Sequence, residues 1–216
     1  HECSSAASDV YKRQSLDTPD DIIFDWLQET AYPDQPMGRT ILGPADKVRK
    51  FDRRDLSDFV SENYSPDRLI LAAAGGVKHE EIVSLAKEQF GSLKSSKIKY
   101  STDPINFEGG EFRREKELEQ AHMALAFDGP SYVDDEIYAA QIYSVALGGG
   151  MSSRLFQEIR EKRGLCYSIF AQSVAYRDGG STLIYAGTSE ERLKELSELT
   201  FDELKSCLLY TSDAAD

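Results

Sequence analysis

A predicted hairpin constrains the fold of this chain more than any other feature. Two predicted strands, residues 165–176 and 181–187, lie on either side of the tetrapeptide Arg177-Asp178-Gly179-Gly180. An Asp-Gly pair between two strand segments is typical of a tight turn that joins neighbouring antiparallel strands. The chain is therefore expected to build part of its core around an antiparallel sheet.

The segments around this hairpin predict an α+β layout. Residues 121–127 alternate in polarity and indicate another strand, and the charged segment 111–117 indicates an edge strand. Helices are expected at 134–147, from Ser152 or Ser153 to residue 162, and at 189–205. Strands and helices in this order predict antiparallel strands with helices packed on one face of the sheet.

The first half of the chain looks like the end of a similar unit. Thr18-Pro19 predicts a helix start, with threonine as the cap and proline at the first helical position, and the helical spacing continues to Ala31. Short helices are expected at 47–51 and 54–64, a buried strand at 68–74 and a helix at 79–90. The sequence thus predicts two related half-domains, joined by a linker and edge strand at 94–119.

The two ends of the chain are predicted to be adapter-derived. One coding sequence for residues 207–216, reversed and complemented, encodes residues 5–13 in another frame. An inverted DNA sequence on both sides of a reading frame is typical of a transposon-based sequencing library. We therefore expect residues 1–14 and 207–216 to be artefacts, and residues 15–206 to be a fragment cut at both ends.

Cysteine content and composition exclude several classes of protein. Cys166 is the only cysteine inside 15–206, which excludes an internal disulfide and a thiolate metal site there. The net charge of −13 disfavours nucleic-acid binding. Apolar runs such as 69–74 are far shorter than the roughly 20 residues of a membrane span. The compartment stays open between bacterial cytoplasm and periplasm.

Few residues carry a recognisable chemical pattern. His79 and His122 lack the spacing of a helical zinc motif, and Cys166 is interpreted as a small buried side chain. Gly148-Gly149-Gly150 precedes a predicted helix, but no P-loop lysine follows. These glycines favour either a flexible junction between helices or a backbone surface that contacts a peptide ligand.

Arg160 and Tyr167 are the most informative pair. Arg160 ends the predicted helix, and Tyr167 opens the next strand after the turn at Gly164. A guanidinium and a phenol brought together in one cleft can bind a peptide carbonyl and the oxyanion formed from it. From the spacing alone, an ordinary surface arginine and a core tyrosine are the simpler interpretation.

Two long motifs resemble a known family. Residues 148–160 and 164–168 resemble the second domain of the pitrilysin/insulinase (M16) zinc metallopeptidases. Residues 21–27 and 36–44 resemble the segment after the zinc site in that family, closest to bacterial relatives of the mitochondrial processing peptidase β subunit. The resemblance implies that 15–93 is the C-terminal part of a zinc-bearing first domain and 120–206 the N-terminal part of a second domain.

The resemblance also implies a mechanism and site residues. The family binds Zn²⁺ through an inverted His-x-x-Glu-His motif and a downstream glutamate, and a zinc-bound water attacks the scissile carbonyl. Arg160 and Tyr167 match the arginine and tyrosine that bind the peptide substrate and stabilise the tetrahedral intermediate. Gly148, Gly149 and Gly150 are expected to contact the same substrate.

The zinc motif does not occur in this sequence. By alignment the third ligand would fall near Tyr11, which is not a zinc ligand. We therefore expect Zn²⁺ in the full-length parent, as a homo- or heterodimer, and no metal ligand in this chain. Three readings stay open: a fragment of an active zinc endopeptidase, which is favoured; a fragment of a partner subunit that donates the Arg160–Tyr167 pair without zinc ligands; and a non-catalytic structural core-type subunit.

Overall fold

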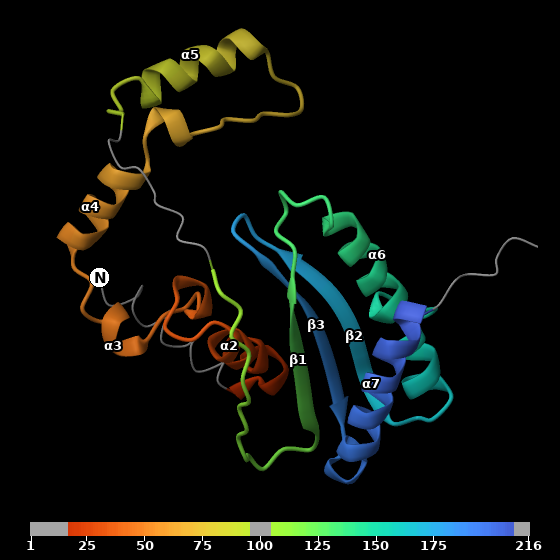
Figure 1. The fold of residues 1–216 in the computed structure, drawn as a ribbon. Coiled ribbons are helices and arrows are strands. Elements are labelled where there is room, and N and C mark those ends of the chain that lie inside the picture. Colours follow the sequence, from red (N-terminus) through yellow and green to blue (C-terminus); the bar gives the residue numbers. More distant parts are fainter. Residues whose placement is uncertain (1–16, 96–104, 210–216) are drawn as a thin grey trace, which may run out of the picture. The chain divides into compact units, whose positions relative to one another are not determined.

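The computed structural model describes residues 17–95 and 105–209 (Figure 1). These residues divide into two compact units, one formed by 17–43 with 105–209 and the other by 44–95. Among the described helices, none combines the length and apolar character needed to cross a membrane. The predicted artefact at 1–14 lies outside the described residues, as does 96–104 of the predicted linker.

The first unit contains a three-stranded antiparallel sheet in the order β1-β3-β2. Strand β1 spans Ala121–Gly129, β2 spans Cys166–Ala175 and β3 spans Gly180–Thr188. The predicted hairpin and strand at 121–127 are confirmed. The Tyr176 amide donates to the Gly179 carbonyl oxygen at 2.7 Å and closes the tight turn.

Helices α6 (Ile137–Gly148) and α7 (Leu193–Leu209) lie on one face of this sheet (Figure 1). Alternate residues of β2 and β3 point toward these helices, because successive side chains of a strand point to opposite faces. The resulting hydrophobic core contains Leu147, Leu155, Ile159, Leu165, Cys166, Ile169, Ala171, Ile184, Ala186 and Leu196. The predicted α+β fold is confirmed.

Helix α2 (Pro19–Ala31) packs against the opposite face, which the sequence did not predict (Figure 1). The Phe24 ring centroid lies 6.1 Å from that of Phe170 and 5.6 Å from that of Tyr185. The Tyr32 hydroxyl donates to the Gly180 carbonyl oxygen at 3.1 Å. Pro19 opens the helix as predicted, but the Thr18 side chain makes no capping hydrogen bond.

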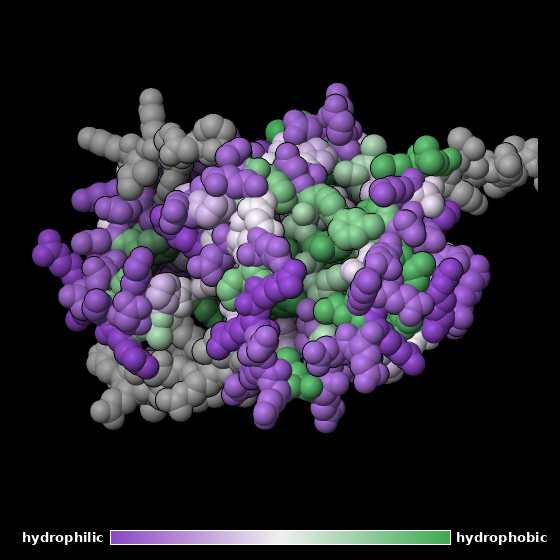
Figure 2. All heavy atoms as spheres, turned by 60° about the horizontal axis from the view of Figure 1, so that its bottom comes forward, coloured by the Kyte–Doolittle hydropathy of each residue, from purple (hydrophilic) through white to green (hydrophobic). Residues whose placement is uncertain are grey.

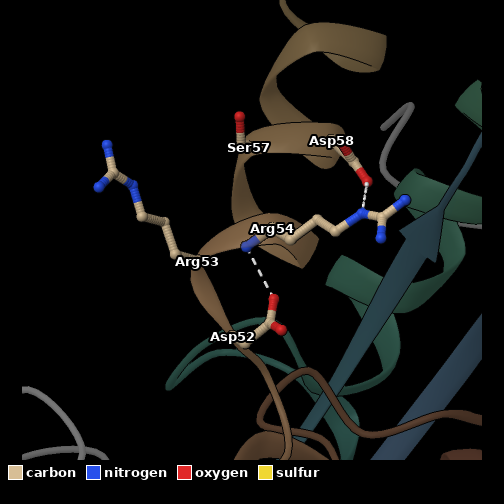
Figure 3. A pocket seen from close by; sticks show the side chains of 5 residues that line it. All are labelled: Asp52, Arg53, Arg54, Ser57 and Asp58. Carbon is tan, nitrogen blue, oxygen red and sulfur yellow. Dashed lines mark hydrogen bonds and ion pairs between the residues drawn. The ribbon is translucent and has the colours of Figure 1, made fainter.

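The second unit contains helices α3 (Ala45–Val48), α4 (Arg53–Asn63) and α5 (His79–Phe90). The helices expected at 54–64 and 79–90 are confirmed. Asp52 caps α4, because its carboxylate accepts hydrogen bonds from the Arg54 and Asp55 amides at 2.7 and 3.0 Å (Figure 3). Figure 3 shows the open hollow beside this cap, where Arg54 also pairs with Asp58.

Two strand predictions are wrong. Residues 68–74 and 111–117 contain no strand. A strand requires a partner for its backbone groups, and the described part of 44–95 contains no strand for 68–74 to pair with. Ile70 is consequently 95% exposed, and other apolar side chains also reach the surface (Figure 2). In 111–117, Phe112 packs on Trp26 of α2 instead, with ring centroids 5.2 Å apart.

Candidate functional site

Arg160 lies in an irregular helix. The segment Phe156–Glu161, labelled η3, is a π-helix, although an ordinary helix was expected there. The Lys162 amide donates to the Gln157 carbonyl oxygen at 3.0 Å, a five-residue step that widens the turn. Ile159 is fully buried in the core, while the neighbouring Arg160 side chain is 30% exposed. Such widened turns are frequent at functional sites.

A tight turn at Gly164 leads from this helix into β2. Gly164 has φ +61°, a left-handed conformation that favours glycine. The Thr188 hydroxyl donates to the Leu165 carbonyl oxygen, and Arg192 Nη1 donates to the Gly164 carbonyl oxygen, both at 2.6 Å. These bonds fix the turn to the end of β3 and to the short 3-10 helix Glu190–Arg192 that precedes α7.

Tyr167 stands at a bulge in β2. Cys166 pairs with Thr188 and Ser168 pairs with Gly187, so Tyr167 has no partner residue in β3. A bulge leaves the extra residue out of the ladder and redirects its side chain. The Tyr167 side chain is accordingly 78% exposed, whereas Cys166 before it is buried. No residue pattern around Tyr167 predicts this bulge.

The turn and the bulge bring Arg160 and Tyr167 together. Arg160 Nε donates to the Tyr167 carbonyl oxygen at 2.8 Å. The guanidinium carbon also lies over the Tyr167 ring, 5.8 Å from its centroid. The two side chains therefore lie next to each other at an exposed surface.

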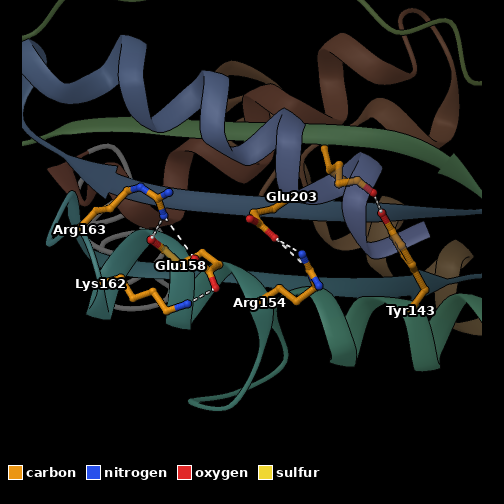
Figure 4. A network of polar contacts seen from close by, with 7 residues as sticks. Tyr143, Arg154, Glu158, Lys162, Arg163 and Glu203 are labelled. Carbon is orange, nitrogen blue, oxygen red and sulfur yellow. Dashed lines mark hydrogen bonds and ion pairs between the residues drawn. The ribbon is translucent and has the colours of Figure 1, made fainter. Parts of the chain in front are cut away.

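Polar contacts surround the helix that carries Arg160 (Figure 4). Arg154 Nη2 lies 2.8 Å from Glu203 Oε2 of α7, and both side chains are largely buried. Glu158 pairs with Lys162 at 2.5 Å and with Arg163 at 3.4 Å. The hydrogen bond from Lys162 lowers the pKa of Glu158. The Arg154–Glu203 pair ties the helix to α7, the Glu158 pairs stay within their own segment, and none of these contacts involves Arg160.

The three glycines differ in their surroundings. Gly148 is buried, and a Cβ at this position would lie 2.3 Å from the Ala171 backbone nitrogen. Its lack of a side chain therefore allows α6 to approach β2 closely. Gly149 and Gly150 are exposed, and a Cβ on Gly150 would have no neighbour within 4 Å. Contact of these glycines with substrate stays a prediction.

Of the remaining candidates, His79 is exposed, His122 is partly buried and Cys166 is buried. His122 Nδ1 is 2.8 Å from the Tyr185 hydroxyl oxygen, on the sheet face that α2 covers. Cys166 is buried, and this burial raises the pKa of its thiol to about 11. Within residues 17–95 and 105–209, no three His, Cys, Asp or Glu side chains are grouped to hold a metal ion. These residues therefore do not fit a zinc site.

Comparison with protein families and sequences gives consistent matches. The family described as "Peptidase M16 inactive domain" matches residues 50–210. An uncharacterized zinc protease of Rickettsia felis is 39% identical over 193 residues, which cover 89% of this chain and 46% of that protein. The uncharacterized zinc protease YmxG of Bacillus subtilis is 36% identical over 182 residues, covering 84% of this chain and 44% of that protein. The chain thus spans about half the length of these relatives.

Solved structures share the fold. The peptidase M16 inactive domain from Pseudomonas fluorescens superposes with a TM-score of 0.87 at 20% identity, over 96% of this chain and 51% of that one. A protease from Helicobacter pylori gives a TM-score of 0.76 at 22% identity, over 94% and 55% of the two chains. A chain of complex III from Candida albicans gives 0.84 at 16% identity, over 97% and 52%.

Proposed function

Because the chain belongs to the M16 peptidase family, we propose that it is part of a zinc-dependent metalloendopeptidase that cleaves extended peptides. In this proposal the chain supplies the carbonyl-binding side chains of the enzyme. The observation that carries the proposal is the approach of Arg160 and Tyr167 at one exposed surface. The names of the Rickettsia and Bacillus relatives support the peptidase class.

The proposed role of the pair is electrostatic. An extended peptide would lie across this surface, with the scissile carbonyl oxygen accepting hydrogen bonds from the Arg160 guanidinium and the Tyr167 hydroxyl. When the carbonyl oxygen becomes an oxyanion, these bonds become charge-assisted and strengthen. Donors that are already in place stabilise the transition state more than the substrate, which lowers the barrier.

In this proposal the zinc ligands lie outside the described residues. Since the described residues do not fit zinc, we derive no catalytic step from a metal in this chain. Zn²⁺, when bound by ligands outside the described residues, would supply the activated water. We expect the purified 216-residue chain to hold no stoichiometric zinc after dialysis and to cleave no peptide. Tightly bound zinc at one ion per chain would contradict this assignment.

The proposal can be tested by substituting Arg160 in a full-length parent protein. Arg160→Gln removes the charge and should lower turnover by on the order of 100-fold, as for loss of one oxyanion donor. Arg177→Gln is the matched control, because Arg177 is exposed in the β2–β3 turn. Steady-state kinetics on a quenched fluorescent peptide give the comparison. Equal turnover in the two variants would remove Arg160 from the site.

A second candidate is a partner subunit of the same family without zinc ligands. The lack of a metal-binding group among the described residues is compatible with this candidate, as it is with the first one. A full-length parent of this kind would bind no zinc alone but would restore cleavage to a zinc-binding partner subunit. Zinc analysis of the full-length protein separates the two candidates. A structural core-type role has only the fold of the Candida albicans chain in its favour.

A further inference from the structure

The guanidinium of Arg160 is held by more than the Tyr167 backbone. It lies over the Phe156 ring, with its central carbon 4.4 Å from the ring centroid. Its Nη1 donates to Glu161 Oε1 at 2.7 Å, and its Nε donates to the Tyr167 carbonyl oxygen at 2.8 Å. The guanidinium carbon thus lies over two rings, those of Phe156 and Tyr167, and two hydrogen bonds are made from the edges of the guanidinium. Contacts of both kinds restrict the rotation of an otherwise flexible side chain.

The count of hydrogen-bond donors shows what these contacts leave available. A guanidinium carries five N–H groups in a fixed planar arrangement. The Tyr167 carbonyl occupies the Nε–H and Glu161 one N–H of Nη1. The second N–H of Nη1 and both N–H groups of Nη2 are therefore not used by these two acceptors. The side chain is 30% exposed, so a ligand can reach it.

We propose that Phe156 and Glu161 are positioning residues, which fix the Arg160 guanidinium so that its other N–H groups face a peptide carbonyl. The inference rests on the proposed function for the identity of the ligand, but not for the geometry. An arginine that is already immobilised loses less conformational entropy when it binds, and its donors stay aligned with the developing oxyanion. Neither residue needs to touch the substrate.

Glu158 provides a matched control on the same helix. It is a glutamate three residues before Glu161, and its carboxylate pairs with Lys162 and Arg163 rather than with Arg160. Glu158→Gln and Glu161→Gln therefore make the same chemical change, and only the second weakens a contact to Arg160, because it replaces a charge-assisted hydrogen bond with a neutral one. Glu161 is half-exposed, so its substitution does not disturb the core.

The first experiment measures the position of Arg160 without any catalysis. In the 216-residue chain, NMR follows hydrogen exchange of the Arg160 Nε–H, whose signal is assigned by its loss in Arg160→Lys. Glu161→Gln and Phe156→Leu should each raise the exchange rate severalfold, because the hydrogen bond to Tyr167 is less well held. Phe156→Tyr should keep the slow exchange because it keeps the ring. Unchanged exchange in both Glu161→Gln and Phe156→Leu would overturn the inference.

The second experiment measures turnover in the full-length parent. A displacement of about 1 Å in a positioned group can lower the rate by on the order of 100-fold. We expect Glu161→Gln to lower kcat by on the order of 10-fold with little change in KM, Glu161→Asp to recover part of this loss, and Glu158→Gln to act like the unaltered enzyme. If Glu158→Gln lowered kcat as much as Glu161→Gln, the positioning role would be wrong.

Together, the two experiments show whether the proposed function or the positioning role of Phe156 and Glu161 is wrong. If Arg160→Gln left turnover unchanged while Glu161→Gln still released the Nε–H, the proposed function would fail and the positioning of Arg160 would stand. If Arg160→Gln abolished turnover while Glu161→Gln changed neither exchange nor kcat, the proposed function would stand and the positioning role would fail.

Discussion

The close contact between α6 and β2 makes Gly148→Ala an informative substitution. An added Cβ would lie 2.3 Å from the Ala171 backbone nitrogen and 2.7 Å from the Ala171 Cβ, whereas ordinary contacts begin at 3.4 Å. The end of α6 would have to move by roughly 1 Å, and the backbone atoms of β2 that it meets cannot rotate away. Since Leu147, the preceding residue, is fully buried in the core, this movement would also loosen core packing.

The size of the effect follows from two opposing contributions. Overpacking of a well-packed core costs about 1–3 kcal/mol, and the clash here is with backbone, which places it at the upper end. Alanine is favoured over glycine in a helix by about 1 kcal/mol, but less at the last residue of α6. We therefore expect Gly148→Ala to lower the free energy of unfolding of the first unit by about 2 kcal/mol.

Urea denaturation of the 216-residue chain measures this difference. Trp26 fluorescence reports on α2, and Gly150→Ala is the matched control, because no atom lies within 4 Å of the added Cβ. The control should change the free energy of unfolding by less than about 0.5 kcal/mol. If Gly148→Ala unfolds at the same urea concentration as Gly150→Ala, the reasoning is refuted, and Gly148 would not be required for packing.

Two further predictions concern ionisation. Burial, with a smaller contribution from the charge of Asp20, raises the pKa of Tyr185 above its ordinary 10.0. The folded chain therefore retains the Tyr185 hydroxyl proton more strongly than the unfolded chain does. We expect the contribution of Tyr185 to the free energy of unfolding to be complete below pH 10 and to decline as the pH rises above 10. The urea midpoints of the unaltered chain and of Tyr185→Phe should therefore approach each other as the pH rises above 10. A difference between the two midpoints that stays constant with pH would contradict a raised pKa of Tyr185. Burial likewise raises the pKa of the Cys166 thiol to about 11, so iodoacetamide at pH 8 should label Cys166 only after unfolding, as followed by peptide mass spectrometry; rapid labelling of the folded chain would disprove this.

Elements with strong local signals were predictable from the sequence. The Asp-Gly turn fixed the β2–β3 hairpin, and helix α5 begins and ends where its pattern indicated, at His79 and Phe90. Pro19 marked the start of α2 because its ring already has a helical φ and needs no amide donor. In each case the determining interactions are made within a few residues of the chain.

Elements that depend on distant partners were not predictable. The apolar run at 68–74 has every local property of a buried strand, yet no described strand of its unit is available to pair with it. The packing of α2 on the sheet face opposite α6 required the contacts of Phe24 with Phe170 and Tyr185, which lie far from it in the sequence. The hydrophobic periodicity of a sequence indicates which side chains are apolar, but it does not indicate which elements pack against them.

The sequence by itself determined the α+β order of the second half and the presence of an arginine and a tyrosine on either side of a glycine turn. The tertiary structure decided how those two residues are presented. The bulge at Tyr167 lies where the pairing of β2 with β3 shifts by one residue, and the wide turn at Arg160 lies where Ile159 is buried while its neighbour is exposed. Both irregularities come from fitting one segment against another, and local residue preferences do not contain that information.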